Sequence, residues 1–168
     1  MKRTLIVVSS VTGNTFKVGQ ALEQAYPNAK LVRTQQVKDD AALIESFDTV
    51  IVGFWCDKGG LPPDLVSILP RIAGKKLGIF STMTGDPTTE RALKWFSSQC
   101  NKIVGESKGN TLKATFLCQG KLSPALMSQF MKNPQLCTPE RQAKWEKAST
   151  HPDEIDCRNA VLAFAPLF

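Results

Sequence analysis

Hydroxyl-bearing side chains are concentrated in one short segment near the amino end of the chain. Ser9-Ser10-Val11-Thr12-Gly13-Asn14-Thr15 contains four of them. It follows a β-branched run and precedes an amphipathic one, so we expect it to join a buried strand to the N-terminus of a helix. Backbone N–H groups, hydroxyls and the helix dipole at such a turn favour a phosphate group.

The residue types of this segment limit which phosphate-containing ligands it can bind. It contains no Lys or Arg, no Gly-Lys-Ser/Thr of a triphosphate-binding loop and no GxGxxG of a dinucleotide-binding turn. A monophosphate held by neutral donors therefore fits it best. The alternative is a helix cap without a ligand, but a cap needs one hydroxyl rather than four.

The elements that position this loop alternate between strand and helix. We expect strands at 4–8, 30–33, 49–55, 76–81 and 111–118, and helices at 14–25, 41–46, 64–72 and 88–100. This order predicts an α/β fold with an open, five-stranded parallel sheet and helices on both faces. Ligands bind at the carboxyl ends of the strands in such sheets, so the loops after the first, third and fourth strands are the candidate site.

The chain departs from simple alternation after Gly120. Ser123-Pro124 and Thr138-Pro139 each predict a helix start, and a third helix is expected from near Pro152 to before Pro166. We predict one domain over 1–168, with 121–150 as an extra helical segment before the terminal helix.

Composition excludes several other classes of protein. No apolar run approaches the roughly 18–20 residues of a membrane span, so we expect no membrane association. Five cysteines without a CxxC pair indicate neither a disulfide framework nor a zinc site, and favour a reducing cytoplasm. The single histidine, His151, is expected in a solvated loop, and we predict no metal site and no catalytic residue.

The net charge of +6 is unevenly placed, because residues 101–149 carry 8 Lys/Arg against 3 Asp/Glu. Such a segment can attract an acidic partner or nucleic acid, or it can be a solvated face without a partner. We expect the partner of this segment to be an acidic protein surface rather than nucleic acid.

The segment Ser10–Thr15 resembles the phosphate motif of flavodoxins, S/T-x-T-G-x-T, at the turn where that family has it. The resemblance implies a three-layer flavodoxin-like fold with strand order 2-1-3-4-5 and bound flavin mononucleotide (FMN). It extends to residues 53–60 at the end of the third strand, to Gly85-Asp86 after the fourth, and to His151-Pro152-Asp153-Glu154 before the terminal helix. Segment 121–150 has no counterpart in this resemblance.

The family's flavin loops, carried onto this chain, define the expected cofactor site. Trp55 is expected either to stack on the flavin ring or to belong to the core, and Met83 to cover the other ring face. Cys56 is expected to be either a reactive thiol or, with fewer assumptions, a packing residue. The expected cofactor-binding residues are Ser10, Val11, Thr12, Gly13, Asn14, Thr15, Phe54, Trp55, Cys56, Asp57, Gly59, Thr82, Met83, Thr84, Gly85 and Asp86.

The resemblance implies an electron-transfer flavoprotein that passes electrons from a reductase to a partner enzyme. The chain is most similar to short flavodoxin-family proteins that serve flavin-dependent reductases in anaerobic bacteria. Two alternatives stay open: an FMN-dependent NAD(P)H:quinone-type oxidoreductase, and a scaffold that keeps the fold without the cofactor.

Overall fold

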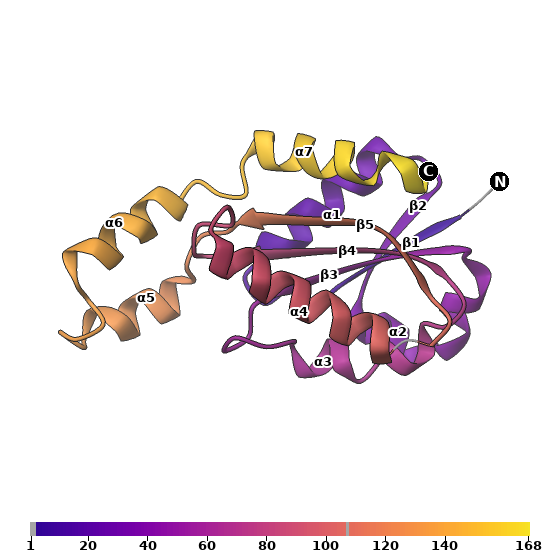
Figure 1. Ribbon diagram of the computed structural model, residues 1–168, viewed down its shortest axis with the longest axis horizontal. Helices are drawn as coiled ribbons and strands as arrows, with labels where there is room; N and C mark the ends of the chain where they lie inside the picture. The colour runs from indigo at the N-terminus through magenta and orange to yellow at the C-terminus, as the bar shows by residue number, and fades with distance from the viewer. Residues whose placement is uncertain (1–2, 107) are drawn as a thin grey trace.

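A single five-stranded parallel sheet forms the centre of the computed structural model, which describes residues 3–106 and 108–168. Its order is β2-β1-β3-β4-β5, which confirms the predicted topology (Figure 1). The strands are β1 (Thr4–Val8), β2 (Ala29–Arg33), β3 (Thr49–Trp55), β4 (Lys76–Met83) and β5 (Thr111–Gln119). Because all pairs are parallel, every carboxyl end lies at one edge.

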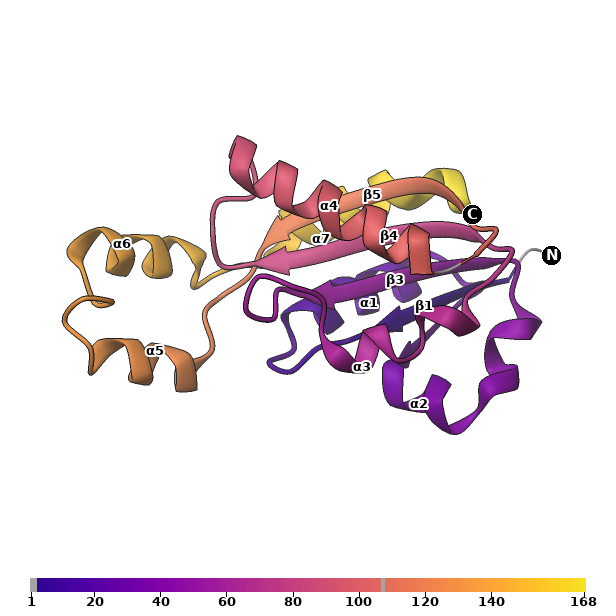
Figure 2. The same cartoon turned by 60° about the horizontal axis from the view of Figure 1, so that its bottom comes forward.

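Helices cover both faces of the sheet, as Figure 2 shows. Helices α1 (Asn14–Ala25) and α7 (Glu154–Phe164) pack on one face, where Ile6, Val8 and Phe80 are buried. The other face carries α2 (Thr34–Asp39), the 3-10 helix η1 (Ala41–Ser46), α3 (Pro63–Val66), the 3-10 turn η2 (Leu69–Arg71) and α4 (Glu90–Glu106). Side chains alternate along each strand, so one continuous apolar run supplies both cores.

Two predicted helices have different bounds in the structure, and one helix was not predicted. The helix expected over 64–72 is divided into α3 and η2, because Pro70 lacks the N–H that a continuous helix needs. The helix expected over 88–100 begins at Glu90, after Thr89 accepts a hydrogen bond from Ala92 N, and extends to Glu106. Helix α2 was not predicted, since its six residues are too few to show a helical period.

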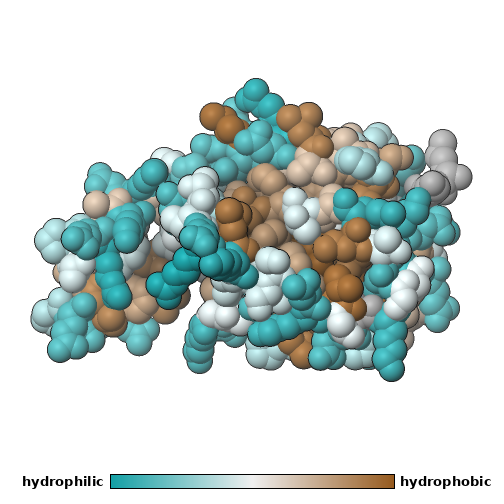
Figure 3. All heavy atoms as spheres, viewed as in Figure 1, coloured by the Kyte–Doolittle hydropathy of each residue, from teal (hydrophilic) through white to brown (hydrophobic). Residues whose placement is uncertain are grey.

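Segment 121–150 forms a helical arm made of α5 (Pro124–Met131) and α6 (Pro139–Ala148). Both helix starts agree with the prediction, because Ser123 and Thr138 accept hydrogen bonds from Leu126 N and Arg141 N. The arm projects beyond the carboxyl edge of the sheet in both views (Figures 1 and 2). Its surface in Figure 3 is mostly hydrophilic, with hydrophobic side chains gathered toward α5.

The predicted single domain spans 1–168, of which residues 1, 2 and 107 lie outside the described part. Across the described residues, no helix combines the length and the apolar character needed to span a bilayer.

Gly53 in β3 allows the Phe80 ring to lie directly on the sheet, because a Cβ at this position would overlap that ring. We expect Gly53→Ala to lower the free energy of unfolding by about 1–3 kcal/mol through overpacking. Gly105→Ala in α4 is the matched control, since its Cβ would meet nothing within 4 Å. The control should be neutral or stabilise the fold by up to about 1 kcal/mol. Equal effects of the two substitutions in urea denaturation would contradict this packing role.

Candidate functional site

The β1–α1 loop, residues 9–15, lies at the carboxyl edge and ends in the N-terminus of α1. Gly13 has φ +93°, a left-handed conformation that side-chain-bearing residues adopt at a cost, and its N–H donates to Ser10 Oγ at 3.2 Å. Thr12 is exposed, and its hydroxyl has no hydrogen-bond partner among the described residues. The loop therefore offers exposed donors at the positive end of a helix.

Two residues far from this loop in sequence hold it in place. Ser9 Oγ donates to Asp64 Oδ1 at 2.8 Å, and the other oxygen of the same carboxylate accepts from Thr34 Oγ1 at 2.5 Å. Pro62 occupies the N-cap position of α3, so Asp64, in the first turn, does not cap that helix. Its carboxylate instead fixes the start of the β1–α1 loop.

Arg33, at the end of β2, brings a cation to the loop. Its Nη1 donates to Ser10 O at 3.1 Å, and its guanidinium lies 4.1 Å from the centre of the Phe16 ring. The loop itself lacks any cation, so the sequence pattern pointed only to neutral donors. The parallel pairing of β2 with β1 places Arg33 beside Val8 and thus beside the loop. A phosphate bound there would meet one positive side chain as well as neutral donors.

The β1–α1 loop is joined to the end of β4 by a buried pair of hydroxyls. Thr15 Oγ1 and Thr82 Oγ1 are 2.8 Å apart, and both residues are buried. Both residues were expected at one site, and the structure places them in contact. Met83, the next residue, lines the cavity described below.

The end of β5 closes this edge and carries the base of the arm. Gly120 N donates to Met83 O, and Gln119 Nε2 donates to Thr84 O, both at 2.9 Å. Asn14 Nδ2 donates to Lys121 O at 2.9 Å, and Lys121 N donates to His151 O at 2.8 Å. The two ends of the arm are therefore held together next to α1.

A strand-end cavity of about 710 Å³ opens between the β3 and β4 loops, α4 and α6. Five of the expected site residues line it: Cys56, Gly59, Met83, Gly85 and Asp86. The remaining lining residues are Thr89, Arg91, Ala92, Trp95, Gln119, Lys144 and Lys147, none of which the sequence pattern assigned to a site. Five of these seven residues belong to α4 or α6, and helical residues are brought to a loop cavity only by tertiary packing.

The aromatic wall of the strand-end cavity is Trp95 of α4. Its Nε1 donates to Gly59 O at 2.9 Å, which ties α4 to the β3 loop. Gly59 has φ +85°, so the β3 loop turns sharply at the point where this carbonyl is held. A rearrangement of the Gly59 peptide would have to break the bond to Trp95.

The two expected aromatic residues of β3 lie differently. Phe54 is fully buried and packs against Trp95 and Phe96, with ring centres 6.1 and 6.3 Å away. Trp55 is half-buried and is not among the residues that line the cavity, and its buried Nε1 has no hydrogen-bond partner among the described residues. Stacking of Trp55 on a ligand stays a prediction, and the structure adds Trp95 as a second candidate.

The titratable groups of the cavity have clear physical environments. Burial raises the pKa of the Cys56 thiol; the Asp57 carboxylate adds to this, and a backbone hydrogen bond at Gly59 opposes it. Hydrogen bonds from the Thr88 hydroxyl and N–H lower the pKa of Asp86, with a smaller contribution from Lys147. At neutral pH the cavity thus holds a protonated thiol and an ionised carboxylate.

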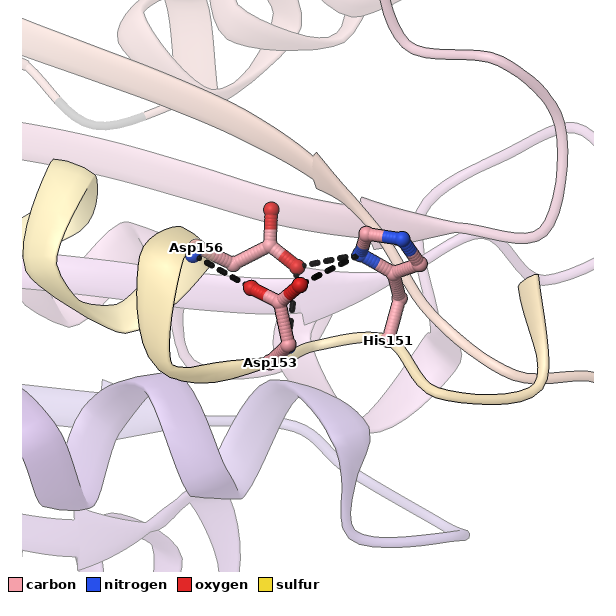
Figure 4. Close-up of side chains that lie close together, drawn as sticks. All are labelled: His151, Asp153 and Asp156. Carbon is pink, nitrogen blue, oxygen red and sulfur yellow. Dashed lines mark hydrogen bonds and ion pairs between the residues drawn. The ribbon is translucent and has the colours of Figure 1, made fainter. Parts of the chain in front are cut away.

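His151 is not the solvated loop residue that we expected. Its side chain is 25% exposed, and its Nδ1 lies 2.6 Å from Asp156 Oδ2 (Figure 4). Asp153 and Asp156 cap α7 reciprocally through each other's backbone N–H, both at 2.9 Å. Each of the three residues offers one ligand atom within 4.8 Å of the others, and the two carboxylates also accept the capping hydrogen bonds of α7. The cluster fixes the junction between the arm and α7.

These features define a class of protein: a parallel α/β domain that carries a hydroxyl-rich helix N-terminus and a cavity between the β3 and β4 loops at the carboxyl edge of its sheet. The chain belongs to the flavodoxin family, since the flavodoxin domain model matches residues 5–165. Members of this family typically bind FMN. The resemblance to flavodoxins that the β1–α1 motif indicated is confirmed.

The chain is similar to a flavodoxin-like domain-containing protein, BilS, of Clostridioides difficile. The two are 28% identical over 167 residues, which cover 95% of this chain and 93% of that protein. Among solved structures it resembles flavodoxin 2 from Bacillus cereus, with a TM-score of 0.58, 18% identity and 99% coverage of both chains. It also resembles general stress protein 14 from Treponema denticola, solved in complex with FMN, with a TM-score of 0.56, 14% identity and 99% coverage of both. These two structures bear on the fold alone.

Cys56 should be a slow nucleophile. Because its pKa is raised, the thiolate fraction at about pH 7 is smaller than for a free cysteine with a pKa of about 8.5. We expect iodoacetamide to alkylate Cys56 more slowly than free cysteine, with a rate that rises as the pH is raised. Peptide mass spectrometry after timed quenching measures this site by site. Cys137, outside the cavity, is the internal control for reagent quality, and rapid alkylation of Cys56 would restore the reactive-thiol interpretation.

Proposed function

We propose that the chain binds one FMN, with its phosphate in the β1–α1 loop and its ring in the strand-end cavity. The observation that carries this proposal is the contact between Thr15 and Thr82. It joins the hydroxyl-rich β1–α1 loop to the end of β4, where Met83, the residue after Thr82, lines the cavity. A ligand with a phosphate at one end and a flat ring at the other fits this arrangement. The cofactor residues expected from the sequence are retained in this proposal.

The donor set of the site suits this cofactor. Ser10 and Thr12, the backbone N–H groups at the start of α1 and the nearby Arg33 can hold a phosphate. Met83 and Trp95 can contact the faces of a ring, while the Gly59 and Gly85 backbone lies close enough to bind its polar edge. FMN bound there would supply one- and two-electron transfer, and the chain would hold, orient and electrostatically tune it.

We propose that the chain acts as an electron carrier between a reductase and a partner flavin-dependent reductase in the cytoplasm. The described lining of the cavity contains no histidine and no pair of carboxylates, and its thiol is protonated. Acid–base or nucleophilic catalysis by the protein therefore has no evident groups in this cavity. The 1–168 chain would act as one domain, with the arm beside its cofactor edge.

A second candidate function is direct reduction of a small acceptor such as a quinone. It is favoured by the contribution of α6 to the cavity, since Lys144 and Lys147 of the arm extend its wall beyond the flavodoxin-like core. Oxidation of NADH or NADPH by a quinone without an added reductase distinguishes this function from that of a carrier.

FMN should bind more tightly than riboflavin by on the order of 100-fold, because each hydrogen bond to a charged group contributes about 1.5–3 kcal/mol. Thr12→Val should weaken FMN binding about tenfold and leave riboflavin binding unchanged. Thr115→Val, an exposed threonine of β5 outside the cavity, is the matched control. Titrations followed by flavin fluorescence measure all these constants. Equal affinities for FMN and riboflavin would rule out the phosphate site.

Electron transfer from the reduced, FMN-loaded protein should favour acidic acceptors. Lys121 follows the end of β5 and Lys132 ends α5 of the arm, and both are exposed, so they should attract an acidic surface and repel a basic one. In stopped-flow experiments we expect acidic cytochrome b5 to be reduced more slowly as salt rises, and basic cytochrome c to be reduced faster. Lys121→Glu combined with Lys132→Glu should reverse the preference while FMN affinity stays constant. If the rates change neither with salt nor with these substitutions, the basic segment is only a solvated face.

A further inference from the structure

Three cations stand at the strand-end cavity. Arg91 comes from α4, and Lys144 and Lys147 come from α6 of the arm. The only carboxylate among the lining residues is that of Asp86, which already accepts two hydrogen bonds from Thr88. None of the three cations forms an ion pair within 4.0 Å with another described residue. The mouth of the cavity therefore carries an excess of positive charge.

Oxidised FMN would not neutralise this charge. Its formal charge resides on the phosphate, and the β1–α1 loop that would hold the phosphate contributes no residue to the cavity lining. The cation near that loop is Arg33, on the opposite side of β1 from β3 and β4. Arg91, Lys144 and Lys147 are thus placed for an anion other than the phosphate of the cofactor.

The strand-end cavity is also larger than a flavin ring requires. Its volume is about 710 Å³, and sites for complete drug-sized ligands span about 300–1,000 Å³. Only the ring end of FMN would enter it, because the phosphate end belongs to the β1–α1 loop. A ring held by Met83 and Trp95 would leave part of this volume free toward Ala92 and α6, where a second flat molecule could lie beside it.

The arm is built to present its lysines to this space. Trp145 is buried and stacks on Phe130 of α5, with ring centres 5.8 Å apart. This contact fixes the rotation of α6 about its axis. Lys144 and Lys147, three positions apart, then lie on neighbouring turns of one side of the helix and reach the same cavity.

We propose that the strand-end cavity binds, beside the flavin ring, a flat aromatic molecule that carries an anionic group, with Lys144, Lys147 and Arg91 as its charge partners. The aromatic part would lie against the apolar wall, and the anionic group would point toward the arm. This inference rests on the proposed function, since it takes the neighbouring position to be that of FMN.

The test uses two anthraquinones that differ in charge. Anthraquinone-2-sulfonate is a stable anionic probe, and 2-(hydroxymethyl)anthraquinone is its neutral counterpart. Isothermal titration calorimetry on the oxidised, FMN-loaded protein should show that the sulfonate binds more tightly than the neutral probe. This difference in affinity should become smaller as the salt concentration rises. Lys144→Ala combined with Lys147→Ala should weaken sulfonate binding about tenfold, because each exposed charge contributes modestly. Binding of the neutral probe should stay the same.

Two matched variants separate this site from general electrostatics. Lys132→Ala removes one charge from the arm outside the cavity, and it should leave sulfonate binding unchanged. Lys144→Arg combined with Lys147→Arg should retain binding, because the charge is kept. Equal affinity for the two probes, or an equal effect of Lys132→Ala, would overturn the proposal.

FMN affinity is measured separately on each variant, by flavin fluorescence. If the Lys144/Lys147 double alanine variant loses FMN affinity but binds the sulfonate normally, the lysines serve the cofactor and the proposal is wrong. If the wild-type protein binds no FMN, the proposed function fails on its own. In that case the sulfonate is titrated into the FMN-free protein. Binding that still depends on Lys144 and Lys147 would support the anion site, and binding that does not depend on them would contradict it.

Discussion

The buried hydrogen bond between Thr15 and Thr82 is the contact on which the organisation of the site depends. It joins the first turn of α1 to the end of β4 at 2.8 Å, inside a region closed to water. Loss of either hydroxyl would leave its partner buried without a hydrogen bond, which costs about 1–3 kcal/mol. The position of the β1–α1 loop relative to the strand-end cavity is therefore fixed before any ligand binds. Preorganisation of this kind lowers the cost of binding a ligand that spans both parts.

The arm is the main elaboration of this fold. It leaves the sheet after β5 and returns at α7, and both ends are held by the hydrogen bonds of Lys121 to His151 and of Asn14 to Lys121. His151 is in turn bound to Asp156, within the cap of α7. A short, closed base allows the helical hairpin to project beyond the carboxyl edge of the sheet (Figure 1). Its own helices are aligned by the stacking of Phe130 on Trp145.

Charge distinguishes the surroundings of the two halves of the site. Around the β1–α1 loop, the Asp64 carboxylate is occupied by Ser9 and Thr34, and Arg33 supplies one nearby cation. Around the strand-end cavity, three cations face one carboxylate. A cofactor ring in this second environment would be exposed to a positive potential, which stabilises added negative charge. The basic composition of the chain thus has a local consequence at the cavity.

The sequence by itself determined the five strands, their parallel arrangement and the β1–α1 loop, because continuous β-branched runs and a hydroxyl-rich turn are local patterns. The order of the strands in the sheet was implied by the resemblance to flavodoxins. The sequence also located both helices of the arm, through Ser-Pro and Thr-Pro starts. Only the tertiary structure decided that Trp95 forms the cavity wall, that Asp64 holds Ser9, and that Lys144 reaches a cavity lined by Cys56. These arrangements bring together residues some 30 to 90 positions apart, and the packing of helices against the sheet, rather than any local pattern, sets which of them meet.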